Sequence, residues 1–123
     1  MRSVEEAIPL LNTDGSVTYT TYDALPTDIY VWDYWAKDPE RSHFRFQLVP
    51  VGNVFRIYIL SQPDYRGRDT GSHSTHRHRD GDGRYYICIN ADLEPRTVAE
   101  CMTWYSFWSE CTVKYIQNGG SFA

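Results

Sequence analysis

The stretch from Thr97 onward carries the pattern that most restricts how this chain can fold. Thr97-Val98-Ala99-Glu100 matches a capping box, in which the Thr and Glu side chains satisfy amides left free by the first turn of a helix. Apolar side chains then recur three and four residues apart as far as Asn118-Gly119-Gly120, where glycine suits a helix end. The members of this face are Val98, Cys101, Met102, Tyr105, Trp108, Thr112, Tyr115 and Ile116.

Three further side chains, Trp104, Phe107 and Cys111, widen the apolar face of this segment. A face this broad must be buried against another layer of structure, either a sheet or other helices. We interpret its aromatic residues as core packing rather than as a cradle for a ligand. The sequence therefore predicts one long helix over 97–118, lying deep against a sheet.

The middle of the chain supplies strands for that sheet. Phe44–Pro50 and Val54–Leu60 flank Val51-Gly52-Asn53 and form the clearest hairpin. In the first arm, apolar residues alternate with Arg45 and Gln47, which predicts one buried and one solvated face. The other strand candidates are Ser16–Tyr22, Ile29–Trp35 and Tyr85–Asn90, of which the last is apolar on both faces, as a covered central strand is.

The order of these elements predicts the fold class. We expect an α+β fold, with an antiparallel sheet of about four to five strands packed by one long C-terminal helix. A length of 123 residues suits a single domain spanning 1–123. At the amino end, Ser3-Val4-Glu5-Glu6 predicts a short helix stopped by Pro9, and Asn12–Gly15 is typical of a turn.

Cysteine usage and the apolar runs bear on the compartment. Cys88, Cys101 and Cys111 match no C-x-x-C pattern, so we interpret them as buried thiols. The first residues lack the apolar segment of a secretory signal, and apolar runs stop well short of the roughly 18 residues that a membrane helix needs. These features predict a cytoplasmic protein without a membrane contact and without a cofactor.

Charge is unevenly distributed along the chain. The net charge of −4 divides into −6 over residues 1–40, +4 over 41–84 and −2 over 85–123. Of the 12 basic residues, ten are Arg, whose planar guanidinium makes bidentate contacts and stacks on aromatic rings. A uniformly basic nucleic-acid binder is excluded, whereas a local basic patch in the middle of the chain is not.

That patch lies in the predicted Arg/His-rich loop 61–84. Loops longer than about 12–15 residues are uncommon in compact domains and are usually functional or disordered. From Tyr65 to Arg84 the loop holds five Arg, three Asp and three of the four His. Its composition is compatible with metal binding, with phosphate chemistry, with recognition of a partner, or with a solvated loop whose Arg and Asp pair with each other.

The metal hypothesis rests on the histidine spacing. In an extended strand, His76, His78 and Asp80 would share one face, and two His with one carboxylate can hold a catalytic metal. The adjacent Arg77 and Arg79 raise the local positive charge and oppose a cation. We therefore assign no metal and keep these three residues as the candidate ligands.

The catalytic hypothesis is a small, metal-independent ribonuclease. Histidine titrates near neutral pH, and arginine stabilises the charge that develops on a phosphate in the transition state. The base would be His76 or His78, the acid His73, and the clamp Arg77 or Arg79. Because histidine pairs in loops are rarely catalytic, we rank this hypothesis below binding.

The favoured hypothesis is a non-catalytic binding protein. Arg and Tyr concentrate binding energy at interfaces, and Tyr65-Arg66-Gly67-Arg68 is a flexible, cationic segment that can stack on bases. We expect the loop to engage a phosphate-bearing nucleic acid or an acidic protein partner. The predicted binding residues are Tyr65, Arg66, Arg68, Arg77, Arg79 and Arg84.

Several short motifs in the second half of the chain carry a resemblance to other small proteins. They include Arg56-Ile57-Tyr58-Ile59, Gln62-Pro63-Asp64-Tyr65, Thr75-His76-Arg77, Arg84-Tyr85-Tyr86-Ile87-Cys88 and Tyr115-Ile116. Over about residues 50–122 the chain resembles small bacterial proteins of phages and integrated mobile elements, a group with no known activity. The resemblance implies a setting in which short chains act as accessory binders or inhibit host defence systems. It adds, as an alternative function, an inhibitor of a host protein complex.

Overall fold

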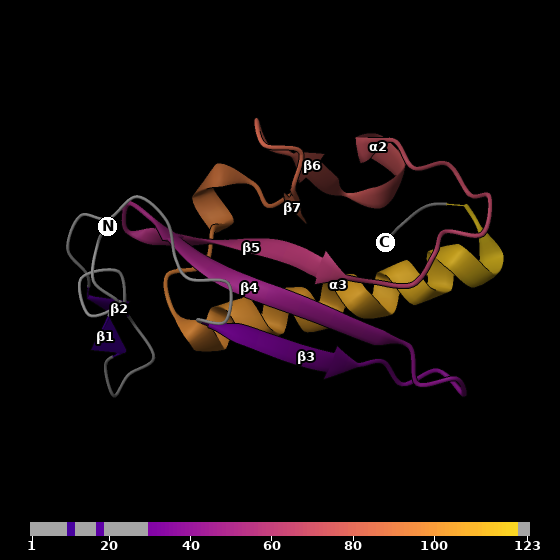
Figure 1. The fold of residues 1–123 in the computed structure, drawn as a ribbon, viewed down its shortest axis with the longest axis horizontal. Helices are drawn as coiled ribbons and strands as arrows, with labels where there is room; N and C mark the ends of the chain where they lie inside the picture. The colour runs from indigo at the N-terminus through magenta and orange to yellow at the C-terminus, as the bar shows by residue number, and fades with distance from the viewer. Residues whose placement is uncertain (1–9, 12–16, 19–29, 121–123) are drawn as a thin grey trace.

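The computed structural model describes residues 10–11, 17–18 and 30–120 (Figure 1). Near the amino end, β1 (Leu10–Leu11) pairs antiparallel with β2 (Val17–Thr18), which falls inside the predicted strand 16–22. The short helix predicted from Ser3, the turn at 12–15 and the rest of that strand lie outside the described residues.

The main sheet has five strands, each antiparallel to its neighbours. Their order across the sheet is β3-β4-β5-β7-β6, so β7 lies between β5 and the earlier strand β6. Figure 1 shows the long helix α3 (Val98–Asn118) running behind this sheet. The predicted α+β arrangement is confirmed. The strands are β3 (Val31–Trp35), β4 (His43–Val51), β5 (Val54–Ser61), β6 (Arg77–Arg79) and β7 (Tyr85–Ile87).

Helix α3 begins and ends where the sequence predicts. Thr97 Oγ1 accepts a hydrogen bond from the Glu100 amide at 3.1 Å, and Glu100 Oε1 accepts one from the Arg96 amide at 2.7 Å. Gly119 follows the last turn with a φ of 72°, a left-handed backbone that glycine adopts without strain. Within the described residues, no helix has both the length and the apolar content that crossing a membrane requires.

The core lies between α3 and the face of the sheet that it covers. Phe44, Phe46 and Leu48 of β4 are fully buried, and Phe46 stacks on Tyr105 of α3 with 4.8 Å between ring centroids. Trp108 stands edge-on to both phenylalanines. Each such side chain contributes about 1.5–3 kcal/mol through the apolar surface that it removes from water.

Two details of the predicted faces are wrong. Met102 and Phe107 were expected in the buried face of the helix but are exposed, because the sheet covers a narrower stripe of α3 than its apolar pattern suggests. Gln47 was expected in water but is buried. The strand predicted over 85–90 is shorter than expected, since β7 ends at Ile87 and the chain then enters the 3-10 turn η1 (Ala91–Leu93).

The predicted loop 61–84 contains regular structure. Helix α2 (Ser72–Thr75) ends at His76, and strand β6 then joins the sheet. Tyr65, expected to be free for a partner, has only 6% of its surface exposed and packs edge-on against Tyr115 of α3. Thr75 is fully buried, and its carbonyl accepts a hydrogen bond from Trp108 Nε1 at 3.1 Å. Contacts with α3 therefore anchor this segment in the core. Because α3 is distant in sequence, no local pattern in the segment indicates these contacts.

Candidate nucleic-acid interface

Strand pairing aligns one side chain from each strand across the sheet. The register places these residues in one row, in the order Val31, Gln47, Tyr58, Tyr86 and His78. Their chain neighbours Phe46, Leu48, Ile57 and Ile87 are buried in the core, so alternation puts the row on the face away from α3. We call this the outer face. At about 4.8 Å per strand the row is about 19 Å long, and it is aromatic towards β7 and ends at an imidazole on β6.

Two arginines stack on tyrosines of this row. The Arg56 guanidinium carbon lies 4.3 Å from the centroid of the Tyr86 ring, and that of Arg84 lies 4.4 Å from the centroid of Tyr58. The two tyrosine rings meet edge-on at 5.8 Å. A stacked guanidinium keeps its N–H edge free for a phosphate and its outer face free for a base.

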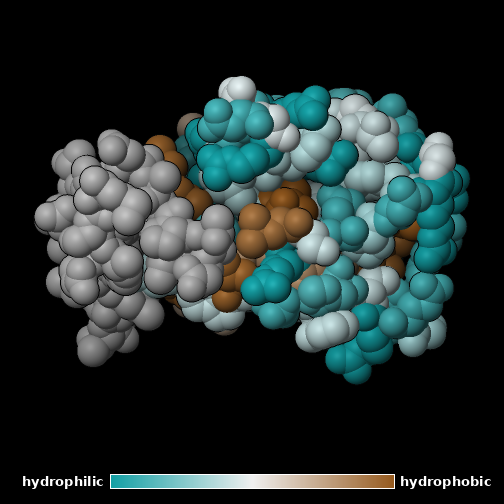
Figure 2. Space-filling view, in the orientation of Figure 1, coloured by the Kyte–Doolittle hydropathy of each residue, from teal (hydrophilic) through white to brown (hydrophobic). Residues whose placement is uncertain are grey.

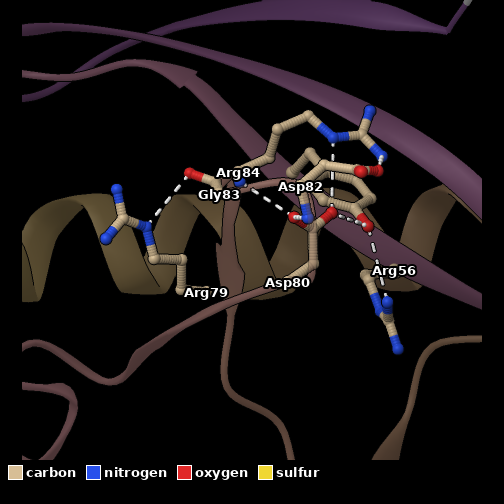
Figure 3. A network of polar contacts seen from close by, with 7 residues as sticks. Arg56, Arg79, Asp80, Asp82, Gly83 and Arg84 are labelled. Carbon is tan, nitrogen blue, oxygen red and sulfur yellow. Dashed lines mark hydrogen bonds and ion pairs between the residues drawn. The ribbon is translucent and has the colours of Figure 1, made fainter.

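The turn between β6 and β7 is organised by the carboxylate of Asp80 (Figure 3). Its Oδ1 accepts hydrogen bonds from the amides of Asp82 and Arg84, both at 2.9 Å. Its Oδ2 accepts from the Tyr58 hydroxyl at 2.9 Å and from Arg84 Nε at 3.3 Å. Desolvation opposes ionisation of Asp80, but these donors outweigh it and lower the pKa of the carboxyl. Asp80 thus fixes the turn and the position of Arg84.

Two further arginines flank Tyr85, on the other side of the hairpin. Arg77 lies between two rings, with its guanidinium carbon 3.7 Å from the centroid of Tyr85 and 4.9 Å from that of Tyr65. Arg79 lies 5.3 Å from the Tyr85 centroid, and its Nε donates to the Gly83 carbonyl at 3.3 Å. In Figure 3 the Arg79 guanidinium points away from Arg84 and Arg56. Neither Arg77 nor Arg79 forms an ion pair with any described residue.

The predicted binding arginines do not form one surface. Arg66 pairs with Glu40 at 3.2 Å. Arg68 donates from Nε and Nη2 to two carbonyls at the end of α3, each at 3.2 Å. Arg77 is held by its tyrosines and by Gln62, whose Oε1 accepts from Nη1 at 3.1 Å. Arg79 and Arg84 alone among the five lie at the tip of the hairpin.

The structure adds two residues that the sequence analysis did not assign to the site, Arg56 and Tyr86. The available signal was alternation, because Arg56 and Tyr58 point away from the apolar Ile57 and Ile59. That signal shows which face of β5 these side chains occupy, but it does not show that β7 is the strand that pairs with β5. We call Arg56, His78, Arg79, Arg84 and Tyr86 the hairpin surface. This surface wraps around the hairpin, because Arg79 lies beside Tyr85, on the face opposite to Arg56 and Tyr86.

The three loop histidines lie in different settings. His73 is on α2, near the carboxyl of Asp69. The pKa of that carboxyl is lowered, chiefly by the hydrogen bond from the Ser74 hydroxyl and to a smaller extent by the electrostatic effect of His73. His76 has a left-handed backbone, with a φ of 53°, and ends α2. His78 packs against Tyr86, with 5.9 Å between ring centroids.

The candidate metal ligands therefore do not converge. An extended chain would have placed His76, His78 and Asp80 on one face. The left-handed backbone of His76 interrupts the extended conformation. Within the described ranges, no group of three or more His, Cys, Asp or Glu side chains is placed to hold a metal ion. The Asp80 carboxylate is instead occupied by the turn and by Tyr58.

The outer face as a whole mixes apolar and hydrophilic surface. Figure 2, viewed from this side, shows apolar surface in the middle of the molecule, with hydrophilic side chains above it, below it and to its right. Trp35 lies at the β3 edge of the same face, where its ring is 4.2 Å from that of His43 and 54% of its surface is exposed. Comparisons with protein-family models, with curated proteins and with solved structures find no match for this chain.

Proposed function

We propose that this chain is a non-catalytic protein that binds single-stranded nucleic acid through the hairpin surface. One observation carries the proposal: Arg56 and Arg79 form no ion pair within the described residues, although each lies beside a tyrosine ring. A guanidinium that is not neutralised attracts phosphate and can hold it through two parallel N–H bonds.

Aromatic and planar groups favour a single strand over a duplex. Unpaired bases stack on aromatic rings and on guanidinium planes, and each stacked base contributes about 1–3 kcal/mol. Tyr86 is half-buried beneath Arg56, while Arg84 presents a stacked guanidinium on a side chain that is 56% exposed. In a duplex the base faces are covered by neighbouring pairs, so these planes would have nothing to stack on.

Local charge supports the same partner despite the negative charge of the chain. Around the hairpin, Arg56, Arg77, Arg79 and Arg84 outnumber the two aspartates of the turn. The carboxylate of Asp80 is turned inward, with 11% of the side chain exposed. The net charge of −4 resides elsewhere in the chain and predicts modest affinity that falls steeply with salt.

Fluorescence anisotropy with labelled single-stranded DNA and RNA of about ten nucleotides tests this function across a salt series. The double variant Arg56→Ala/Arg79→Ala should lose at least about tenfold in affinity. Its salt slope should fall by about 1.4, because each phosphate contact on a single strand contributes about 0.7. The control is Arg66→Ala, which removes one positive charge from a residue paired with Glu40 and should leave binding unchanged.

Two results would overturn the proposal. The first is the absence of binding at low salt, and the second is equal loss in the double variant and in the Arg66→Ala control. The same samples also test a hydrolase, because cleavage of the RNA that disappears on His78→Ala would assign catalysis to this surface in place of binding.

The second candidate function is an inhibitor that binds a host protein complex. Exposed apolar side chains favour it, since Leu93 is 53% exposed and Phe107 is 54% exposed. Aromatic side chains such as Phe107 are enriched in protein interfaces. A captured complex that Phe107→Ser disrupts on size-exclusion chromatography, and that Arg56→Ala/Arg79→Ala leaves intact, would support this candidate over nucleic-acid binding.

A further inference from the structure

A cleft of about 220 Å³ lies where β5 and β7 part. The two strands pair at Tyr58 and Tyr86, after which β7 ends at Ile87 while β5 extends back to Val54. The Cys88 amide donates to the His76 carbonyl at 2.9 Å, so the chain there bonds on the β6 side. The chain then turns through η1 and returns to β5, where the Phe55 amide donates to the Pro95 carbonyl at 2.8 Å, and Glu94 also lines the opening.

The walls of the cleft combine one guanidinium, one carboxylate and apolar surface. Arg56, Tyr86 and Glu94 all line the cleft, and Phe55 and Ile89 supply apolar contacts. Glu94 is half-buried, yet its carboxylate has no hydrogen-bond or ion-pair partner among the residues that the structure describes. Arg56 likewise forms no ion pair there, so the two opposite charges share a cleft without neutralising each other.

This arrangement selects a flat ligand that carries donors on one edge and acceptors on another. Guanine has both: N1–H and the N2 amino group can donate together to a carboxylate, whereas O6 and N7 accept from an arginine fork. Adenine lacks the paired donors, and uracil and thymine lack the amino group. Drug-sized ligands occupy pockets of about 300–1,000 Å³, so this smaller cleft suits one base, with ribose and phosphate outside.

We infer that this cleft is a binding site for the base of one guanosine, with Glu94 on the Watson–Crick edge and Arg56 on the O6/N7 edge. Arg56 then contacts phosphate only where the bound strand has no guanosine at the cleft. The inference rests on the proposed function in one respect, namely that the guanosine belongs to the bound strand. A free guanine nucleotide offers the same base, and the experiment separates the two sources.

In the first arm, the full-length ¹⁵N-labelled protein is titrated with guanosine 5′-monophosphate and, separately, with adenosine 5′-monophosphate. We expect saturable amide shifts around Cys88 and Glu94 with the guanine nucleotide, and at least about tenfold weaker binding of the adenine nucleotide. Glu94→Gln should remove this preference, because its amide N–H₂ would face the donors of guanine. The matched control is Asp92→Asn, which neutralises an exposed carboxylate in η1.

In the second arm, anisotropy compares a uridine oligomer with the same oligomer carrying one guanosine. The guanosine should raise affinity at least about fivefold in the native protein and in Asp92→Asn, and not in Glu94→Gln. If oligomers bind without this preference and neither nucleotide shifts the cleft amides, the guanine site is refuted and strand binding stands. If the guanine nucleotide binds the cleft while no oligomer binds, the site stands and the proposed function falls.

Discussion

Asp80 shows how one side chain can define a local structure and at the same time limit its pH range. Four donors converge on its carboxylate, two from the backbone of the turn and two from side chains. All four favour the ionised form over the neutral one. The position of Arg84 on the hairpin surface therefore depends on the negative charge of Asp80, whose carboxylate is turned inward.

Acid should loosen this turn before it unfolds the sheet. Because the pKa of Asp80 is lowered from 3.8, its contribution is fully present above that value and is lost as pH falls through the lower native pKa. Hydrogen exchange should therefore show the amides of Asp82 and Arg84 losing protection below pH 3.8, ahead of β4 and β5.

The variant Asp80→Ala should show the same loss of protection at neutral pH, and Asp80→Asn, which keeps one acceptor oxygen, an intermediate loss. Unchanged exchange of the Asp82 and Arg84 amides in Asp80→Ala would contradict the role assigned to this carboxylate.

At the scale of elements, the β6–β7 hairpin needs a backbone that few residues adopt. Gly83 has a φ of 85°, in the left-handed region, and its carbonyl holds Arg79. Gly81, two residues earlier, has no such backbone and open space around the position of a Cβ. A side chain is therefore expected to be tolerated at Gly81 but not at Gly83.

Gly83→Ala should cost roughly 1–2 kcal/mol in the free energy of unfolding, because the added Cβ disfavours the left-handed conformation. Urea denaturation monitored by tryptophan fluorescence measures this loss. Gly81→Ala is the matched control and should change stability by less than about 0.5 kcal/mol. Equal effects of the two substitutions would contradict the assigned turn geometry.

The sequence predicts the elements whose signals are local. The capping box at Thr97 and the alternation of Phe44, Phe46 and Leu48 place α3 and the β4–β5 hairpin correctly, because neighbouring residues decide both. Segment 61–84 was predicted as a loop because its order comes from distant contacts, such as Trp108 with Thr75. Of the hairpin surface, the sequence names Arg79 and Arg84 as binding residues but not Arg56 or Tyr86, because the pairing of β5 with β7 skips β6 and leaves no local signal.

At the scale of the whole molecule, segment 61–76 is tied to α3 at several points along the helix. Trp108 Nε1 donates to the carbonyl of Thr75, and the Tyr115 hydroxyl donates to the carbonyl of Asp69 at 2.8 Å. Arg68 donates to the last carbonyls of the helix. Strand β6 directly follows this segment, so its position depends on these hydrogen bonds to α3.

Tyr115→Phe should lower the free energy of unfolding by about 1 kcal/mol, the net value of one hydrogen bond. The dependence of that free energy on urea should not change, because the segment unfolds together with the core. Urea denaturation gives both quantities. A smaller urea dependence, or a separate early transition, would mean that the segment opens independently of α3.

The placement of α3 also has a consequence for synthesis on the ribosome. The β4–β5 hairpin is made well before the helix that covers it, so Phe44, Phe46 and Leu48 face water until Trp108 has left the exit tunnel. Exposed apolar strands of a nascent chain associate with one another. We therefore expect that a chaperone which binds apolar strands holds this chain during translation, and that slow elongation before Val98 lowers its soluble yield.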